Sequence, residues 1–234
     1  MNKKNKYVDF VSDEHFFECV KWVCDSYPEK NEKVDLESLQ KNIIDPFKMV
    51  FDIINGELCV DDWIVNERIR QADKTINNRI GDFHQKLLGG VRGWINLKTG
   101  DQSKVDLKKD DDSIFIELKN KFNTVNSDSL SKVREKLKKA VSDHPKAIAY
   151  WAYIIEKDGS SYESEWIYLG ENNPKIRKIW GSNVYQLITG DKQALEKVWK
   201  ILPVVISDVL GDKTNISQED MKKLIELFEY AFKN

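Results

Sequence analysis

Cysteine, proline and glycine are scarce in this chain, and long apolar runs are missing. The three cysteines, Cys19, Cys24 and Cys59, are odd in number and irregular in spacing, which argues against a disulfide framework and predicts free thiols in a reducing cytoplasm. No apolar stretch approaches the roughly 18 residues of a membrane helix. The N-terminal sequence MNKKNKYVDF also lacks the apolar segment of a secretory signal. We therefore expect a cytoplasmic protein with no membrane segment.

A strong charge of either sign is also absent, since the formal net charge is −2. This balance excludes a globally basic nucleic-acid coat but leaves open a positive cleft. With 5 prolines and 11 glycines, no repeat and no low-complexity segment, no flexible linker is evident. We predict a single domain with a helical part over about residues 1–90, a sheet core over about 91–170 and a helical part over about 171–234.

Hydrophobic periodicity and capping residues predict most of the helices. The long helix expected at residues 61–88 carries the stripe Ile69, Ala72, Ile76, Ile80, Phe83 and Leu87 and ends at Gly89-Gly90. The other expected helices cover residues 12–27, 35–42, 46–55, 128–142, 174–180, 193–210 and 217–232.

Strands are predicted in the middle of the chain. They cover residues 94–97, a hairpin at 104–121, and two apolar strands, KAIAYWAYIIE and SEWIYL, joined by a turn at Asp158-Gly159. This order favours an α/β (α+β) fold with a βββαβ core, in which a mixed sheet is flanked by helices and extended by helices at both ends of the chain.

The hairpin places acidic side chains face to face. If residues 110–113 form its loop, Asp106 lies opposite Glu117, with Cβ atoms about 5 Å apart. Because side chains alternate along a strand, Lys119 shares the face of these two carboxylates, whereas Ile116 and Leu118 point into a core. Two carboxylates beside an ammonium suit a divalent cation and a water molecule that it activates, which is the chemistry of phosphodiester hydrolysis.

The pattern acid-x-Lys alone is weak, since a chain with 39 acidic residues contains several such matches by chance. Its position on the alternating strand IFIEL, after a second acid and a tight turn, favours a functional site over an edge hairpin with solvated charges. The acidic run at residues 110–112 is best explained as a solvated turn.

These residues resemble the PD-(D/E)XK nucleases, with Asp106 as the first acid and Glu117-Leu118-Lys119 as the second motif. The runs GDFHQKLLGGVRGW and IELKNKFNTVNS resemble, more narrowly, type II restriction endonucleases that cut GGNCC or GGWCC sites. The resemblance is concentrated in residues 67–131. Val105 stands where many of these nucleases have proline, which leaves Asp101 and Asp110 as competitors for the first acid.

The resemblance implies a Mg²⁺-dependent endonuclease that acts on double-stranded DNA as a homodimer in a prokaryotic cell. Asp106, Glu117 and the Leu118 carbonyl are the expected metal ligands, and Lys119 is the expected catalytic lysine. Alternatives are a structure-selective repair or junction nuclease of the same fold, and a non-catalytic DNA-binding domain.

Further residues are candidates for DNA binding or for shaping the site. Glu67 is a possible extra ligand, although helix-surface glutamates are usually only solvated. His84, next to Gln85, would place the scissile phosphate or be an interior histidine. The polar segment after the hairpin offers donors to DNA, namely Asn120, Lys121, Asn123, Thr124 and Asn126. The basic residues of the next helix, 132–139, would follow a DNA backbone or be ordinary surface charges.

Overall fold

The computed structural model describes residues 5–28, 39, 43–97, 105–124, 127–211 and 216–232. The chain divides into two compact units, one made of residues 1–21 and 81–234 and the other of residues 22–80. We call the first the sheet unit and the second the helical unit. The helix predicted at residues 35–42 lies almost wholly outside the described residues.

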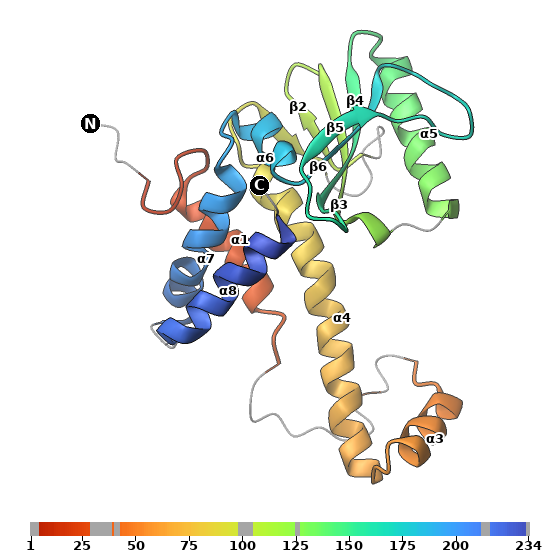
Figure 1. The fold of residues 1–234 in the computed structure, drawn as a ribbon, viewed down its shortest axis with the longest axis vertical. Coiled ribbons are helices and arrows are strands. Elements are labelled where there is room, and N and C mark those ends of the chain that lie inside the picture. The colour runs from red at the N-terminus through yellow and green to blue at the C-terminus, as the bar shows by residue number, and fades with distance from the viewer. Residues whose placement is uncertain are drawn as a thin grey trace. The chain divides into compact units, whose positions relative to one another are not determined.

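The sheet unit is built on a six-stranded mixed sheet with the order β1-β2-β3-β4-β6-β5 (Figure 1). Its strands are β1 (Trp94–Asn96), β2 (Leu107–Lys109), β3 (Ile114–Lys121), β4 (Ile148–Ile155), β5 (Tyr162–Glu165) and β6 (Ile176–Trp180). The first three strands pair antiparallel, β3, β4 and β6 run parallel, and β5 returns antiparallel to β6. The predicted α/β fold with a mixed sheet is confirmed.

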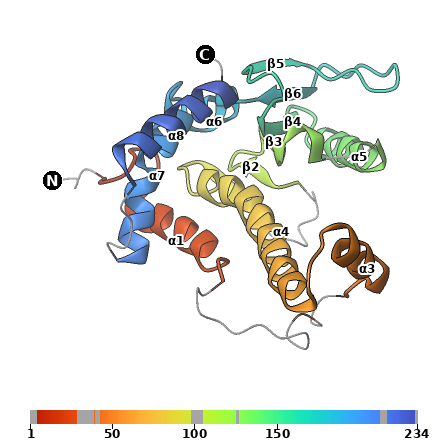
Figure 2. The same cartoon turned by 60° about the horizontal axis from the view of Figure 1, so that its bottom comes forward.

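Helix α5 (Ser127–Asp143) connects the parallel strands β3 and β4, as a parallel pair requires a crossover. Its apolar residues Val133 and Leu137 pack on Phe115 and Ala149 in the main core. Figure 2 shows α5 on one side of the sheet and α6 (Ser182–Thr189) on the other. The succession β1, β2, β3, α5, β4 is the predicted βββαβ order.

Two predictions in the second half of the chain are wrong. Residues 174–180 form strand β6, not a helix, and they insert between β4 and β5, so the two apolar strands do not form a hairpin. Ile176 and Ile179 are both buried within a short strand that is paired on both sides, so that pairing with β4 and β5 decides its conformation. Helix α6 was not predicted.

The long helix α4 (Val60–Leu88) belongs to both units, and its predicted apolar stripe holds only toward its end. Phe83 and Leu87 are buried, whereas Ile69 is exposed, so that the prediction is wrong there. The stripe assumed one environment along the whole helix. In the helical unit α4 instead buries Trp63 and Ile64 in a cluster with Leu39.

The end of α4 is closely packed at the predicted Gly89-Gly90. A Cβ atom on Gly89 would lie 2.4 Å from the Asn96 Cβ, and one on Gly90 would lie 2.2 Å from the His15 ring. Only glycine permits this approach of β1 and of helix α1 (Asp13–Cys24) to the end of α4.

The remaining helices mostly follow the predictions. Ser12 accepts a hydrogen bond from the His15 N–H at the start of α1, and Ser217 caps α8 through the Asp220 N–H. Their bounds are α3 (Pro46–Asn55), α7 (Ala194–Leu210) and α8 (Gln218–Ala231). None of the helices that the structure describes is both long and apolar enough to span a bilayer.

Candidate active site

The hairpin of β2 and β3 has the predicted register. Leu107 pairs with Ile116 and Lys108 with Phe115, which places Asp106 opposite Glu117. Ile116 and Leu118 are buried, as expected. Phe115 belongs to the core beneath α5, so alternation along β3 turns the Glu117 and Lys119 side chains toward the α5 side of the sheet.

Asp106 is held by its backbone and its side chain. Its N–H donates to the Ile116 carbonyl at 3.0 Å, and its carbonyl accepts from the Leu97 N–H at 2.9 Å and from Gln85 Nε2 at 3.3 Å. Its Oδ2 accepts from the Leu118 N–H at 2.7 Å. These contacts fix the carboxyl group before any ligand arrives.

Two lysines form ion pairs with the buried side chain of Glu117. Lys119 Nζ lies 2.8 Å from Glu117 Oε1 and 3.6 Å from Asp106 Oδ2. Lys136 Nζ, from α5, lies 2.8 Å from the same Glu117 Oε1. The sequence did not single out Lys136 as a site residue, because its distance to Glu117 depends on how α5 is rotated on the sheet.

Burial and neighbouring charge act against each other in this cluster. Burial raises the pKa of Asp106 above its usual value, although Lys119 opposes the shift. Burial lowers the pKa of Lys119, but the Asp106 and Glu117 carboxylates outweigh it and the net pKa is raised. The Asp106 and Glu117 carboxylates therefore favour the ammonium form of Lys119.

One oxygen of the site has no partner. Glu117 Oε2 is buried and, among the described residues, finds no hydrogen-bond donor. A buried carboxylate oxygen without a donor requires an explanation, and a hard cation is a fitting one because Mg²⁺ prefers oxygen ligands and uses few carboxylates. The described residues contain no cluster of three or more His, Cys, Asp or Glu side chains suited to a metal, so the fit rests on Asp106, Glu117 and a carbonyl such as that of Leu118.

Of the two competing first acids, the structure describes only Asp110. Asp101 lies outside the described residues, and Asp110 belongs to the turn, where its N–H donates to the Gly93 carbonyl. Asp111 Oδ1 accepts a hydrogen bond from the Ser113 N–H, and Asp112 forms an ion pair with Lys108 at 2.6 Å. The predicted turn at residues 110–112 is confirmed.

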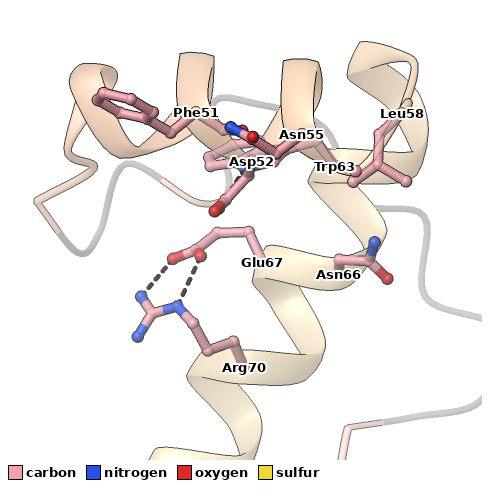
Figure 3. Close-up of a pocket in the computed structure, with 9 residues that line it drawn as sticks. Phe51, Asp52, Asn55, Leu58, Trp63, Asn66, Glu67 and Arg70 are labelled. Atoms are coloured by element: carbon pink, nitrogen blue, oxygen red, sulfur yellow. Dashed lines mark hydrogen bonds and ion pairs between the residues drawn. The ribbon is translucent and has the colours of Figure 1, made fainter.

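Glu67 lies in the helical unit, in a cavity of about 480 Å³ between α3 and α4 (Figure 3). Arg70 binds both of its oxygens, at 2.5 and 2.7 Å, and Gln71 adds a bond at 2.9 Å. The hydrogen bonds from Arg70 lower the pKa of Glu67 despite burial. In this arrangement the Arg70 guanidinium balances the charge of the Glu67 carboxylate. A role for Glu67 as a metal ligand stays a prediction.

His84 has an interior ring. Its Nδ1 lies 2.7 Å from the Tyr185 hydroxyl, and its ring packs edge-on against Phe83 and Tyr185. Burial lowers the pKa of His84 to about 4, so the imidazole is neutral at pH 7. These contacts agree with the interior histidine that the sequence left open as the alternative.

The other residues predicted to bind DNA or to shape the site lie at different places in the structure. Gln85 Nε2 bonds Asn96 Oδ1 at 3.0 Å besides the Asp106 carbonyl, and so supports the first acid. Asn120 lies on the sheet face opposite Glu117, with a buried Oδ1. Lys121 and Asn123 are exposed just beyond Lys119, Thr124 ends the short helix η1 (Phe122–Thr124), and Asn126 lies outside the described residues.

The basic residues of α5 do not form one exposed track. Arg134 is buried, donates to the Trp166 carbonyl at 2.9 Å and lies over the Trp166 ring. Lys138 pairs with Glu171, and Lys139 pairs with Asp143 at 2.6 Å. Lys136 points into the acidic site, whereas the pairs of Lys138 and Lys139 lie on the surface and are about half exposed.

We expect Lys136→Met to destabilise the cation-free protein by about 1–3 kcal/mol, because Glu117 then keeps only one charged partner in a buried position. Urea unfolding measures the loss. The exposed Lys132 on the same helix supplies the control, and Lys132→Met is expected to change stability by about 0.5 kcal/mol or less. Equal losses in the two variants would contradict the assignment.

Comparison with known proteins extends the resemblance from residues 67–131 to nearly the whole chain. The model of the Eco47II restriction endonuclease family matches residues 8–211. The type II restriction enzyme Sau96I of Staphylococcus aureus is 32% identical over 98% of this chain and 91% of its own length. The type II restriction enzyme Eco47II of Escherichia coli is 32% identical over 96% of this chain and 98% of its own length.

Proposed function

The chain belongs to the Eco47II restriction endonuclease family and is a type II restriction endonuclease, a site-specific DNA hydrolase, and we propose that it uses Mg²⁺ held by Asp106 and Glu117. The observation that carries this proposal is the buried, unpartnered Glu117 Oε2 opposite the fixed Asp106 carboxyl. When bound, Mg²⁺ would supply positive charge to the phosphate and a water molecule that deprotonates more readily.

The protein groups divide the remaining work. Asp106 and Glu117 hold the cation, and the hydrogen bond from the Leu118 N–H keeps Asp106 in place. Lys119 lies beside both carboxylates, with its Nζ 2.8 Å from Glu117 Oε1. As an ammonium it would donate hydrogen bonds that orient the attacking water and offset the charge that develops on the phosphate.

DNA contacts would begin where the catalytic strand ends. Lys121 and Asn123 are exposed directly after Lys119, so a backbone whose scissile phosphate lies at Lys119 passes close to them. A lysine ammonium suits phosphate and an asparagine amide suits a base edge. We assign these residues to DNA binding and keep His84 and Asn120 as interior residues.

The substrate we propose is a short palindromic duplex of the GGNCC or GGWCC type, in the cytoplasm of a prokaryotic cell. A palindrome presents two equivalent scissile phosphates related by a two-fold axis. A homodimer with one site per subunit matches this symmetry and cuts both strands.

Digestion of plasmid DNA tests the function. We expect the purified protein with Mg²⁺ to produce discrete fragments, and EDTA to stop cleavage. A smear, or cutting that requires a branched substrate, would instead indicate a structure-selective nuclease of the same fold. Absence of cutting on unmodified DNA that contains GGNCC and GGWCC sites would refute the proposal.

A further inference from the structure

Helix α3 of the helical unit is apolar on two sides. Met49 and Ile53 pack against the buried cluster that contains Trp63 and Ile64. A second side of the helix carries four large apolar side chains that are mostly exposed, Phe47 at 78%, Val50 at 56%, Phe51 at 68% and Ile54 at 70%. We call these four residues the α3 outer face.

Such a helix is unusual on a protein surface. A surface helix normally has one apolar stripe and polar residues around the rest of its circumference, whereas in α3 the polar residues Lys48, Asp52 and Asn55 are confined to one flank. Phe51 is one of the residues that line the cavity between α3 and α4, but Figure 3 shows its ring pointing away from the Glu67–Arg70 pair, and most of its side chain remains exposed. The α3 outer face therefore needs a partner.

The spacing of the face points to a second copy of the same chain. Its members are separated by three, one and three residues, a pattern that is unchanged when the helix is reversed. In an antiparallel pair of α3 helices about a two-fold axis, Phe47 would meet Ile54 of the second copy, and Val50 would meet its Phe51. An isologous interface requires this self-complementarity.

The exposed apolar area of the α3 outer face and the charges beside it fit a second copy of the chain. At roughly 200 Å² per phenylalanine, Phe47 and Phe51 expose about 300 Å² in each copy, and with Val50 and Ile54 the two copies approach the roughly 1,000 Å² of a specific interface. Lys48 and Asp52, on the flank of the helix, pair with each other. Two copies would therefore meet without opposing like charges.

We propose that the α3 outer face is the surface on which two copies of this chain associate. The inference rests on the proposed function, because a palindromic substrate requires two related active sites. It goes beyond that function by assigning the interface to four side chains that no catalytic step uses.

Sedimentation velocity of the full-length protein over a range of concentrations tests the assignment. We expect the wild-type protein to be a dimer and Val50→Asp and Ile54→Asp each to raise the dimer dissociation constant at least a hundredfold. Circular dichroism checks that both variants keep their helix content, and two variants guard against one failing to fold. The matched control is Leu227→Asp on α8, a residue that is 64% exposed, and it should remain dimeric.

Three results would overturn the inference: a monomeric wild-type protein, α3 variants that stay dimeric, or dissociation caused only by Leu227→Asp. A monomer would mean that DNA or another part of the same chain covers the face. Discrete cutting of plasmid DNA by the wild-type protein is scored separately, so failure of the interface is distinguished from failure of the endonuclease function.

Discussion

Glu117→Gln is expected to lower the rate of DNA cleavage about a thousandfold or more, equivalent to about 4 kcal/mol of transition-state stabilisation. The amide has nearly the same size as the carboxylate but carries no charge, so it is a poor ligand for Mg²⁺. It also leaves Lys119 and Lys136 beside a neutral group at the oxygen they now share. The rate is measured as initial cleavage of plasmid DNA over a range of Mg²⁺ concentrations.

The matched control is Glu135→Gln, an exposed glutamate on α5 that should cleave at the wild-type rate. Asp106→Asn should resemble Glu117→Gln, since the two carboxylates act on one cation. In both site variants, duplex binding without Mg²⁺ should persist. Cleavage within tenfold of wild type in Glu117→Gln would exclude this carboxylate as a catalytic metal ligand.

Lys119→Met is expected to reduce the maximal cleavage rate by about 10²- to 10⁴-fold, the range for loss of a positioned proton-handling or charged group. Methionine keeps most of the stem but removes the ammonium that lies 2.8 Å from Glu117. Because both carboxylates remain, the Mg²⁺ concentration for half-maximal rate should not rise. This separates Lys119→Met from Glu117→Gln, which should require more Mg²⁺.

Lys108→Met serves as the control for Lys119→Met. Lys108 stands on the neighbouring strand β2 and pairs with Asp112 in the turn, so its loss should leave cleavage nearly unchanged. A Lys119→Met protein that cleaves like wild type would transfer the catalytic role to another cation of the site, of which Lys136 is the one in contact with Glu117.

The catalytic hairpin was predictable because its interactions are local. A four-residue loop sets the register of two adjacent strands, and alternation then places Asp106, Glu117 and Lys119 on one face. The family resemblance seen in the sequence was concentrated in residues 67–131, which include this hairpin. Lys136 was not predictable, because its contact with Glu117 joins a helix to a strand across a distance that depends on packing.

The errors in the predicted fold also come from contacts between segments that are distant in the sequence. Strand β6 lies in a segment predicted as a helix over residues 174–180, and its pairing with β4 and β5 makes it a strand. The apolar stripe predicted for α4 would hold if one packing surface ran along the whole helix, but α4 belongs to two units. The sequence left the five basic residues of α5 open as a DNA track or as ordinary surface charges, and packing turns Arg134 inward and Lys136 toward Glu117. In each case non-local contacts decide what local pattern cannot.

The most direct test of the central claim is to sequence the ends produced when a genome of known sequence is digested by the wild-type protein and, in parallel, by Glu117→Gln. The account predicts that wild-type ends fall at one short palindromic sequence of the GGNCC or GGWCC type, and that Glu117→Gln yields almost none of them. Ends scattered without a common sequence, or the same ends at a similar rate from both proteins, would contradict it.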